Sequence, residues 1–199
     1  MLDFSIETKY QTMGYKYICG IDEAGRGPLC GPVVAAACIL PMGVFIEGLN
    51  DSKKLTEQKR EKIFEQIKKE AITYSIAQST VREIDELNIL GATLLAMHRA
   101  VEGLSPAADF LLVDGNVYKD FNCEGCCVIK GDSLSPSIAA ASILAKVTRD
   151  RICKELDCEY PQYGIAQHKG YGTKMHMDAL RKLGATPIHR KQFIRFLDK

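Results

Sequence analysis

The segment CGIDEAGRGPLCGPVV, from Cys19 to Val34, constrains the fold of this chain more than any other. It joins two apolar runs, YKYICGI and VVAAACIL, whose composition is typical of buried strands. The glycines and prolines between the runs favour a turn, so we expect a β-hairpin. Two adjacent carboxylates, Asp22 and Glu23, stand where the first strand enters that turn.

The rest of the chain alternates between helix-like and strand-like patterns. Apolar spacing predicts helices over 55–71, 87–104, 135–156 and 172–184, and short apolar runs predict strands over 73–80, 109–115 and 126–132. Ser135 is a suitable N-cap for the third helix, and Pro136 suits its first position. This order predicts an α/β fold with a mixed five-stranded sheet flanked by helices.

The charge of the chain is unevenly distributed. The net charge is +1, yet residues 165–199 hold eight Lys or Arg against two Asp or Glu. A basic segment on an acidic body suits a polyanionic ligand, although charge alone slightly favours a solvated helical face. With 199 residues, we expect one domain over 1–199, in which 160–199 is a basic, mostly helical C-terminal segment.

Other features limit the class of protein. The longest apolar run is too short to cross a bilayer, and the N-terminus lacks the pattern of a signal peptide. The cysteines at 19, 30 and 38 lie in apolar runs, and the pair at 123 and 126 has no second pair at zinc spacing. We therefore expect reduced thiols and a cytoplasmic, monomeric protein that does not bind membranes.

Three acidic positions share one context. Asp22 (with Glu23), Asp114 and Asp132 each end an apolar strand and precede a glycine or a turn. If these strand ends share one rim of the sheet, four carboxylates converge, and divalent cations would compensate their charge. Oxygen ligands select Mg²⁺ or Mn²⁺, and a pair of such ions is an arrangement that cuts phosphodiesters. Taken singly, an Asp-Gly at a strand end is usually just a turn, and Asp132 fits an ordinary helix entry, so no one of these acids is a specific signal.

Together these residues resemble the signature of bacterial type 2 ribonuclease H, the ribonuclease HII family. The matching blocks are GIDEAGRGPLCGPVVAAACIL, LNDSKKLT, LLVDG, KGDSLSPSIAAASILAKVTRD and HKGYGT, in this order over residues 19–173. The sister ribonuclease HIII type has a different glycine motif and an N-terminal extension. Because this chain opens almost directly on its first expected strand, we expect the HII type.

The resemblance implies a ribonuclease H-like fold and a metal-dependent endonuclease. Such an enzyme cuts the RNA strand of RNA/DNA hybrids. It also cuts on the 5′ side of single ribonucleotides in duplex DNA, leaving 3′-hydroxyl and 5′-phosphate ends. By position, the catalytic metal ligands would be Asp22, Glu23, Asp114 and Asp132, and the ions Mg²⁺ or Mn²⁺ in a two-metal site.

The resemblance also implies substrate contacts. Gly25, Arg26 and Gly27 match the substrate-binding loop, whose glycines let the backbone approach a sugar-phosphate chain while Arg26 holds a phosphate. Tyr171 matches the family's ribose-binding tyrosine, and Tyr163 is the nearest rival. Further candidate phosphate contacts are Lys53, Ser142, Lys146 and Arg149.

Two other functions stay open at this stage. One is another metal-dependent nuclease of the same fold, similar to a resolvase or an integrase, which would share the acids but would not need to recognise a 2′-hydroxyl. The other is a non-catalytic protein that binds RNA/DNA hybrids. The loop Gly25–Gly27 favours the ribonuclease over the first, and the complete set of acids speaks against the second.

Overall fold

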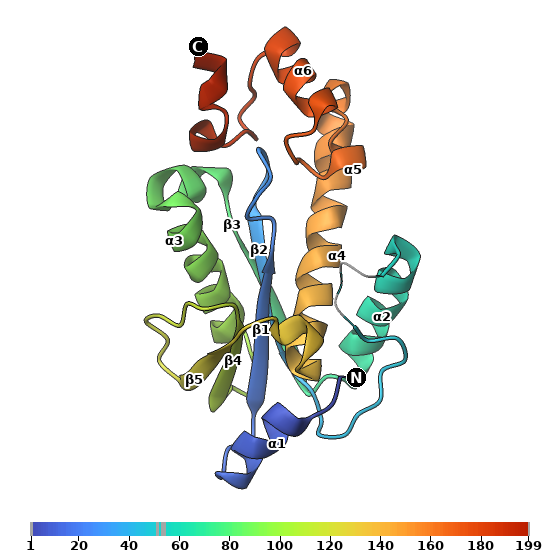
Figure 1. Cartoon of the computed structure of the whole chain (residues 1–199), viewed down its shortest axis with the longest axis vertical. Coiled ribbons are helices and arrows are strands. Elements are labelled where there is room, and N and C mark those ends of the chain that lie inside the picture. Colours follow the sequence, from blue (N-terminus) through green and yellow to red (C-terminus); the bar gives the residue numbers. More distant parts are fainter. Residues whose placement is uncertain (1, 51, 53–54, 199) are drawn as a thin grey trace.

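The computed structural model describes residues 2–50, 52 and 55–198 of the chain. One mixed sheet forms its centre, with the strand order β3-β2-β1-β4-β5 (Figure 1). The strands are β1 (Ile18–Ala24), β2 (Val33–Ile39), β3 (Thr73–Ser79), β4 (Phe110–Asp114) and β5 (Glu124–Val128). β1, β2 and β3 pair antiparallel, whereas β4 runs parallel to both β1 and β5. The prediction of an α/β fold with a mixed five-stranded sheet is therefore confirmed.

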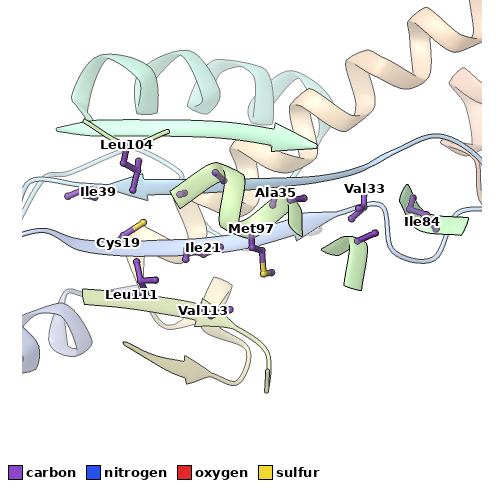
Figure 2. Close-up of a cluster of buried hydrophobic side chains, with 14 residues drawn as sticks. Cys19, Ile21, Val33, Ala35, Ile39, Ile84, Met97, Leu104, Leu111 and Val113 are labelled. Atoms are coloured by element: carbon purple, nitrogen blue, oxygen red, sulfur yellow. The ribbon is translucent and has the colours of Figure 1, made fainter. Parts of the chain in front are cut away.

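Helices cover both faces of the sheet. α3 (Val81–Glu102) lies on one face, and α2 (Glu57–Glu70) and α4 (Pro136–Glu159) lie on the other (Figure 1). Figure 2 shows the first core layer, where Cys19 and Ile21 of β1 lie between side chains of β2 and β4 and Met97 of α3 belongs to the same cluster. The second layer packs Ala36 of β2 against α2 and α4. Successive side chains of β2 therefore alternate between the two core layers, as expected for a sheet buried on both sides.

A close contact between β1 and α4 depends on Gly20. A Cβ atom at this residue would lie 2.1 Å from the carbonyl carbon of Ser137 and 2.2 Å from the backbone nitrogen of Ile138. Both atoms belong to the backbone of α4, which cannot move aside as a flexible side chain can. Gly20 thus sets how near α4 lies to the strand that carries Asp22.

The start of α4 is held by residues far away in sequence. Ser135 is the N-cap as predicted, and its hydroxyl accepts a hydrogen bond from the N–H of Ile138. That hydroxyl donates to the carboxylate of Glu7 over 2.6 Å, and the same carboxylate accepts from the N–H of Ser137 over 3.2 Å. Glu7 belongs to α1 (Ser5–Thr12), a helix that the sequence analysis missed. Its buried negative charge meets the positive end of the α4 dipole.

The helix predicted over 87–104 exists as α3, which begins earlier than expected, at Val81, and ends at Glu102. Leu87 and Leu90 are exposed, and Asn88 interrupts the helix with a φ of 60°. Before this kink Ile84 is buried, and after it the buried face includes Ala92 and Met97. The apolar spacing is therefore inward after the kink but fails beside it, at Leu87 and Leu90.

The C-terminal segment packs over the end of the sheet where β1 enters its loop (Figure 1). It contains the short helices η3 (Pro161–Tyr163), α5 (Ile165–His168), η4 (Lys191–Phe193) and η5 (Arg195–Asp198), and the longer α6 (Lys174–Leu183). Its own small core joins Ile165 and Leu180 to Cys30 of the loop and Cys153 of α4. A β-bridge between Cys30 and His189 ties the segment to the same loop.

Two histidines in this segment are buried and hydrogen-bonded to each other. His189 Nδ1 accepts from the N–H of Thr186, so we place its proton on Nε2, which donates to His176 Nε2 over 3.1 Å. His176 Nδ1 donates to the carbonyl of Tyr171. Burial lowers the pKa of His189 to about 4 and also lowers that of His176. The proton of this hydrogen bond lies between the Nε2 atoms of the two histidines. Without it, these nitrogens and the thiol of Cys30 would suit a soft metal ion.

Two further features bear on the expected class of protein. All eight cysteines are free thiols, which agrees with the expectation of reduced cysteines. Among the described residues, no helix is long and apolar enough to cross a membrane.

The contact at Gly20 leads to a prediction. Replacing Gly20 with Ala should lower the free energy of unfolding by about 3 kcal/mol or more, because the new methyl group meets backbone that cannot yield. Gly43→Ala is the control, since Gly43 has a φ of +75° but open space around its Cβ position. The control should lose only about 1–2 kcal/mol through backbone strain. Urea unfolding curves measure both, and equal losses would show that the contact with α4 is not tight.

Candidate active site

The ends of two neighbouring strands bring three of the predicted acids together. The parallel register pairs Ile21 of β1 with Val113 of β4, so Asp22 and Asp114 are the next residues on adjacent strands. Glu23 follows directly, one residue before β1 ends at Ala24. Asp22 shares the α4 side of the sheet with Ala36, its partner on β2, while Glu23 pairs with Ala35, which faces α3. Both nevertheless line one cleft, because the strand ends there.

This cleft has a volume of about 310 Å³ and is bordered by the strand ends, the loop after β1, α4 and the C-terminal segment. Its lining holds most of the residues that the sequence analysis selected. They are Asp22, Glu23, Gly25, Arg26, Gly27, Asp114, Ser142, Lys146, Arg149 and Tyr171. Acids that could hold cations therefore lie beside cations that could hold phosphates.

Asp22 is the most strongly perturbed of the acids. Burial raises its pKa well above the usual range, and the nearby charges of Glu23 and Asp114 raise it further. Two hydrogen bonds act in the opposite direction, one from the hydroxyl of Ser142 and one of 2.7 Å from the N–H of Glu23. A cluster of this kind holds excess negative charge, which a bound cation would neutralise.

The fourth acid, Asp132, is not among the lining residues of the cleft. Asp132 is in η2 (Gly131–Ser133), four residues beyond the end of β5, and not at a strand end as the sequence pattern suggested. It is buried and does not line the cleft. Its neighbour Gly131 is nevertheless close, since the N–H of Gly131 donates to Asp114 Oδ1 over 2.7 Å.

The loop after β1 lies against the predicted tyrosine. Gly25 has a φ of +100°, which favours glycine, and a Cβ atom at Gly27 would lie 3.3 Å from the ring of Tyr171. Arg26 forms an ion pair with Glu23 over 3.2 Å and keeps a half-exposed side chain. Tyr171 is 49% exposed and accessible to a ligand, whereas the rival Tyr163 is buried and donates its hydroxyl proton to the carbonyl of Gly184. The structure therefore favours Tyr171 over Tyr163.

The candidate phosphate contacts differ in their surroundings. Lys146 lines the cleft and pairs with Asp150 over 2.7 Å. Ser142 is buried on the cleft floor beside Ser52, with 2.9 Å between their hydroxyl oxygens. Lys53 lies outside the described residues.

Arg149 differs from the expectation. Its buried guanidinium donates to the backbone carbonyls of Pro32 and Cys30, over 2.9 and 2.8 Å. It therefore fastens the loop after β1 and is not available to bind a phosphate.

Two cleft residues escaped the sequence analysis. Asp150 is buried, and it faces Lys146 one helical turn away and Arg60 over 3.6 Å. Lys169 lines the cleft next to Gly170 and Tyr171, with an ion pair to Glu57 over 3.8 Å. The four-residue spacing of Lys146 and Asp150 is the signal that could have found the first, and the HKGYGT block contains the second.

The donor set of this cleft suits a hard divalent cation. It offers carboxylate oxygens from Asp22, Glu23 and Asp114, with no histidine or thiol among its lining residues in the described part of the chain. Oxygen-only sites select Mg²⁺, Mn²⁺ or Ca²⁺ over zinc and copper.

Comparison with known proteins agrees with this geometry. Residues 19–196 match the model of the ribonuclease HII family. The chain belongs to that family. A ribonuclease HII of Ruminiclostridium cellulolyticum is 55% identical over 191 residues, which are 96% of this chain and 75% of that protein. The structural match to the ribonuclease H2 from Pyrococcus horikoshii OT3 has a TM-score of 0.76 at 28% identity and covers 92% and 97% of the two chains.

Membership of the ribonuclease HII family identifies the chain as a metal-dependent ribonuclease H. It is a hydrolase that cuts RNA in RNA/DNA hybrids and acts in the removal of ribonucleotides from DNA. The Bst ribonuclease HIII, solved in complex with Mn²⁺, shares the fold with a TM-score of 0.67 at 17% identity, covering 90% of this chain and 67% of that one. The resemblance and the fold predicted from the sequence are both confirmed.

The perturbed Asp22 leads to a prediction about stability. Without divalent ions at neutral pH, Asp22→Asn should raise the free energy of unfolding by about 1 kcal/mol, because the amide removes a buried charge yet can still accept the N–H of Glu23. The raised pKa gives the same sign: between the unfolded and folded pKa values, the native state holds the extra proton, so wild-type stability falls as pH rises.

Thermal unfolding with EDTA, and then with Mg²⁺ or Mn²⁺, checks this prediction. The ions should stabilise the wild type and have little effect on the Asn variant. Asp178→Asn, at an exposed ion pair on α6, is the control and should change stability by less than about 0.5 kcal/mol. Equal stabilisation of wild type and Asp22→Asn by the ions would contradict the assignment of Asp22 as a ligand.

Proposed function

We propose that the cleft hydrolyses the phosphodiester on the 5′ side of a ribonucleotide and leaves 3′-hydroxyl and 5′-phosphate ends. Asp22, Glu23, Asp114 and Asp132 would hold two Mg²⁺ or Mn²⁺ ions. The observation that carries this proposal is the convergence of Asp22, Glu23 and Asp114 in one cleft, with Asp22 buried between two like charges. When bound, such ions acidify the attacking water and neutralise the charge that develops on the phosphate.

The residues of the chain prepare this chemistry by position. The strand register holds Asp22 and Asp114 side by side on adjacent strands. Ser142 and the N–H of Glu23 donate to Asp22, and the N–H of Gly131 donates to Asp114. These donors orient the carboxylates before any ligand arrives, so little reorganisation is needed during the reaction. Asp132, beside Gly131, would complete the set when substrate is bound.

The loop Gly25–Gly27 and Tyr171 would recognise the ribonucleotide. The 2′-hydroxyl both donates and accepts hydrogen bonds, so exposed backbone groups of a glycine-rich loop can recognise it. Tyr171 lies against this loop at Gly27 and offers both a ring face and a hydroxyl. We infer that its ring packs on the sugar and its hydroxyl binds the 2′-oxygen.

Cations around the cleft would hold the neighbouring phosphates. Arg26 is half-exposed, and Lys146 and Lys169 also line the cleft. Ser142 and Lys53 complete the proposed set of substrate contacts, with Ser142 acting at the cleft floor. Because each cation already faces an acid, binding phosphate would exchange one ionic partner for another.

We also propose that residues 1–199 act as a single catalytic domain, with 160–199 packed onto it as a C-terminal segment. The core that Cys30, Cys153 and Leu180 share supports the assignment of a single domain. The free cysteines support work in a reducing cytoplasm. The monomeric state remains a prediction, which sedimentation equilibrium would check.

A substrate panel tests the proposed chemistry. The wild type, with Mg²⁺ or Mn²⁺, should cut an RNA/DNA hybrid and a DNA duplex with one ribonucleotide, but not an all-DNA duplex. Asp22→Asn and Asp114→Asn should each lower kcat by about 1,000-fold or more while they still bind the hybrid, since they remove metal ligands and not substrate contacts. Cleavage of all-DNA duplexes would favour a resolvase-like nuclease. Binding without metal and without cleavage would favour a non-catalytic hybrid-binding protein.

Tyr171 leads to a separate prediction. Tyr171→Ala should reduce kcat/KM on a duplex with one ribonucleotide by about 100-fold, because both the packing on the sugar and the hydrogen bond are lost. Tyr171→Phe keeps the ring and should lose about 10-fold, as expected for one hydrogen bond. Steady-state kinetics on this duplex and on a hybrid measure both variants. An equal loss on the two substrates would argue against a role in recognising the junction.

A further inference from the structure

We propose that Arg190 is a positioning residue, which orients the peptide groups of the loop Gly25–Gly27 toward the substrate without touching the substrate itself. This inference rests on the proposed function of the loop. It concerns a residue about 160 positions away in sequence, in the basic C-terminal segment whose role the sequence left open.

The guanidinium of Arg190 is saturated by the backbone of one loop. The side chain is fully buried, and its donors reach five carbonyl oxygens. Nη2 donates to Gly25 over 2.6 Å and to Pro32 over 3.1 Å. The other acceptors are the carbonyls of Arg26 (3.0 Å), Pro28 (2.8 Å) and Gly31 (2.9 Å). A guanidinium has five N–H donors, so each has one partner here.

This arrangement suits arginine and excludes lysine. An ammonium group offers three donors from a single point, whereas the planar fork of arginine spreads five donors over a wide arc. Without the fork, several buried carbonyls of the loop would lack a partner. Such groups are costly to bury, and the loop would turn them toward water.

The direction of these carbonyls fixes the direction of the N–H groups. In a trans peptide the C=O and the following N–H point to opposite edges of a plane. Because Arg190 draws in the carbonyls of Gly25 and Arg26, the N–H groups of Arg26 and Gly27 point away from it. Both residues line the cleft. The loop therefore presents N–H donors to the site where a sugar-phosphate chain would lie.

A neighbouring peptide shows the same geometry directly. Arg190 binds the carbonyl of Pro28, and the N–H on the opposite edge of that peptide, from Leu29, donates to the carbonyl of Gly170 over 2.8 Å. Gly170 precedes Tyr171, the proposed ribose contact. Arg190 thus stands behind the loop, with the cleft and Tyr171 in front of it.

The backbone around Arg190 reinforces this position. The N–H of Arg190 donates to the carbonyl of Leu29, and the N–H of Gly31 donates to the carbonyl of Ile188, each over 2.8 Å. Arg149 of α4 packs against Gly25 as well, but its hydrogen bonds to the loop backbone go to the carbonyls of Cys30 and Pro32. Of these two arginines, Arg190 is the one that donates to the carbonyls of Gly25 and Arg26.

The test compares Arg190→Lys with two matched variants. Arg149→Lys weakens the hydrogen bonds that the same loop accepts at Cys30 and Pro32, so it measures how a general loss of loop stability affects recognition. Arg181→Ala removes one charge from an exposed site of the same C-terminal segment, so it measures the effect of charge alone. All are assayed below their own melting temperatures, on a DNA duplex with one ribonucleotide and on an RNA/DNA hybrid.

The expected result is specific to Arg190. Arg190→Lys should lower kcat/KM on the single-ribonucleotide duplex by about 100-fold, as expected for misplaced contacts, and by less on the hybrid, which offers a 2′-hydroxyl at every position. The two matched variants should leave the ratio of the two substrates within about twofold of the wild type. The slope of log Kd against log salt should stay unchanged in Arg190→Ala, because the loss of a cation that contacts a phosphate would reduce that slope by about 1.

A second variant covers the loss of the side chain. Arg190→Ala leaves a buried space the size of a guanidinium, and added methylguanidinium should restore part of the cleavage of the single-ribonucleotide duplex. Folded Arg190→Ala that methylguanidinium does not rescue, or an unchanged substrate ratio in folded Arg190→Lys, would overturn the proposal. A reduced salt slope would also overturn it, in favour of a direct phosphate contact.

The outcome for the wild type separates this inference from the function on which it rests. A wild-type enzyme that does not distinguish the single-ribonucleotide duplex from an all-DNA duplex would contradict the proposed function itself. A wild type that makes this distinction, together with an Arg190→Lys variant that makes it equally well, would contradict only the role of Arg190.

Discussion

The burial of Asp22 between Glu23 and Asp114 is the interaction on which the rest of the structure depends. Three neighbouring carboxylates repel one another, so the fold must hold them in place against that repulsion.

The elements that hold these acids in place are themselves hard to displace. The parallel register of β1 and β4 fixes the backbone of two of the acids, and α4 brings the Ser142 hydroxyl to Asp22. α4 can lie that near only because Gly20 has no side chain and because Glu7 and Ser135 hold the helix start. The core is thus arranged to maintain a charge cluster that costs stability until a cation binds.

Much of this arrangement could be predicted from the sequence, because it depends on local patterns. The five strands, the helix start at Ser135 and the placement of Asp22, Glu23 and Asp114 at strand ends all follow from apolar runs and their turn residues. The predictions that differ from the structure have a common cause. The apolar spacing of α3 gives no sign of the kink at Asn88, whose Oδ1 accepts the N–H groups of Leu90 and Gly91. Asp132 lies in an irregular turn where the sequence suggested a strand end. Periodicity describes regular backbone, and it is least informative where the backbone leaves a regular path.

Arg149 and Arg190 could not have been assigned from the sequence, for a different reason. An arginine on a helix near the predicted site or in a basic segment is most simply interpreted as a phosphate contact or a solvated charge. Both side chains are instead buried and bound to backbone carbonyls of one loop, and such partners leave no signature in the residue types. Every residue type has a backbone carbonyl. No spacing or composition therefore indicates that an arginine from the far end of the chain will bind the carbonyls of Gly25–Pro32. Only the folded structure relates the two segments.

The net charge of the C-terminal segment therefore overstates its attraction for a polyanion. Arg190 contributes to the charge of +6 over residues 165–199, yet it is fully enclosed, and Lys169 is partly neutralised by Glu57. At the cleft, the segment contributes two contacts to the glycine loop. Arg190 binds the backbone of the loop at Gly25, and Tyr171 packs against it at Gly27. A loop rich in glycine is flexible by nature and loses much conformational entropy when it becomes ordered. If that cost were met only on binding substrate, it would reduce affinity equally for DNA and RNA. Meeting it in advance, through five hydrogen bonds from one side chain, removes that cost from binding. The distinction between the two then depends on whether the fixed peptide groups meet a 2′-hydroxyl.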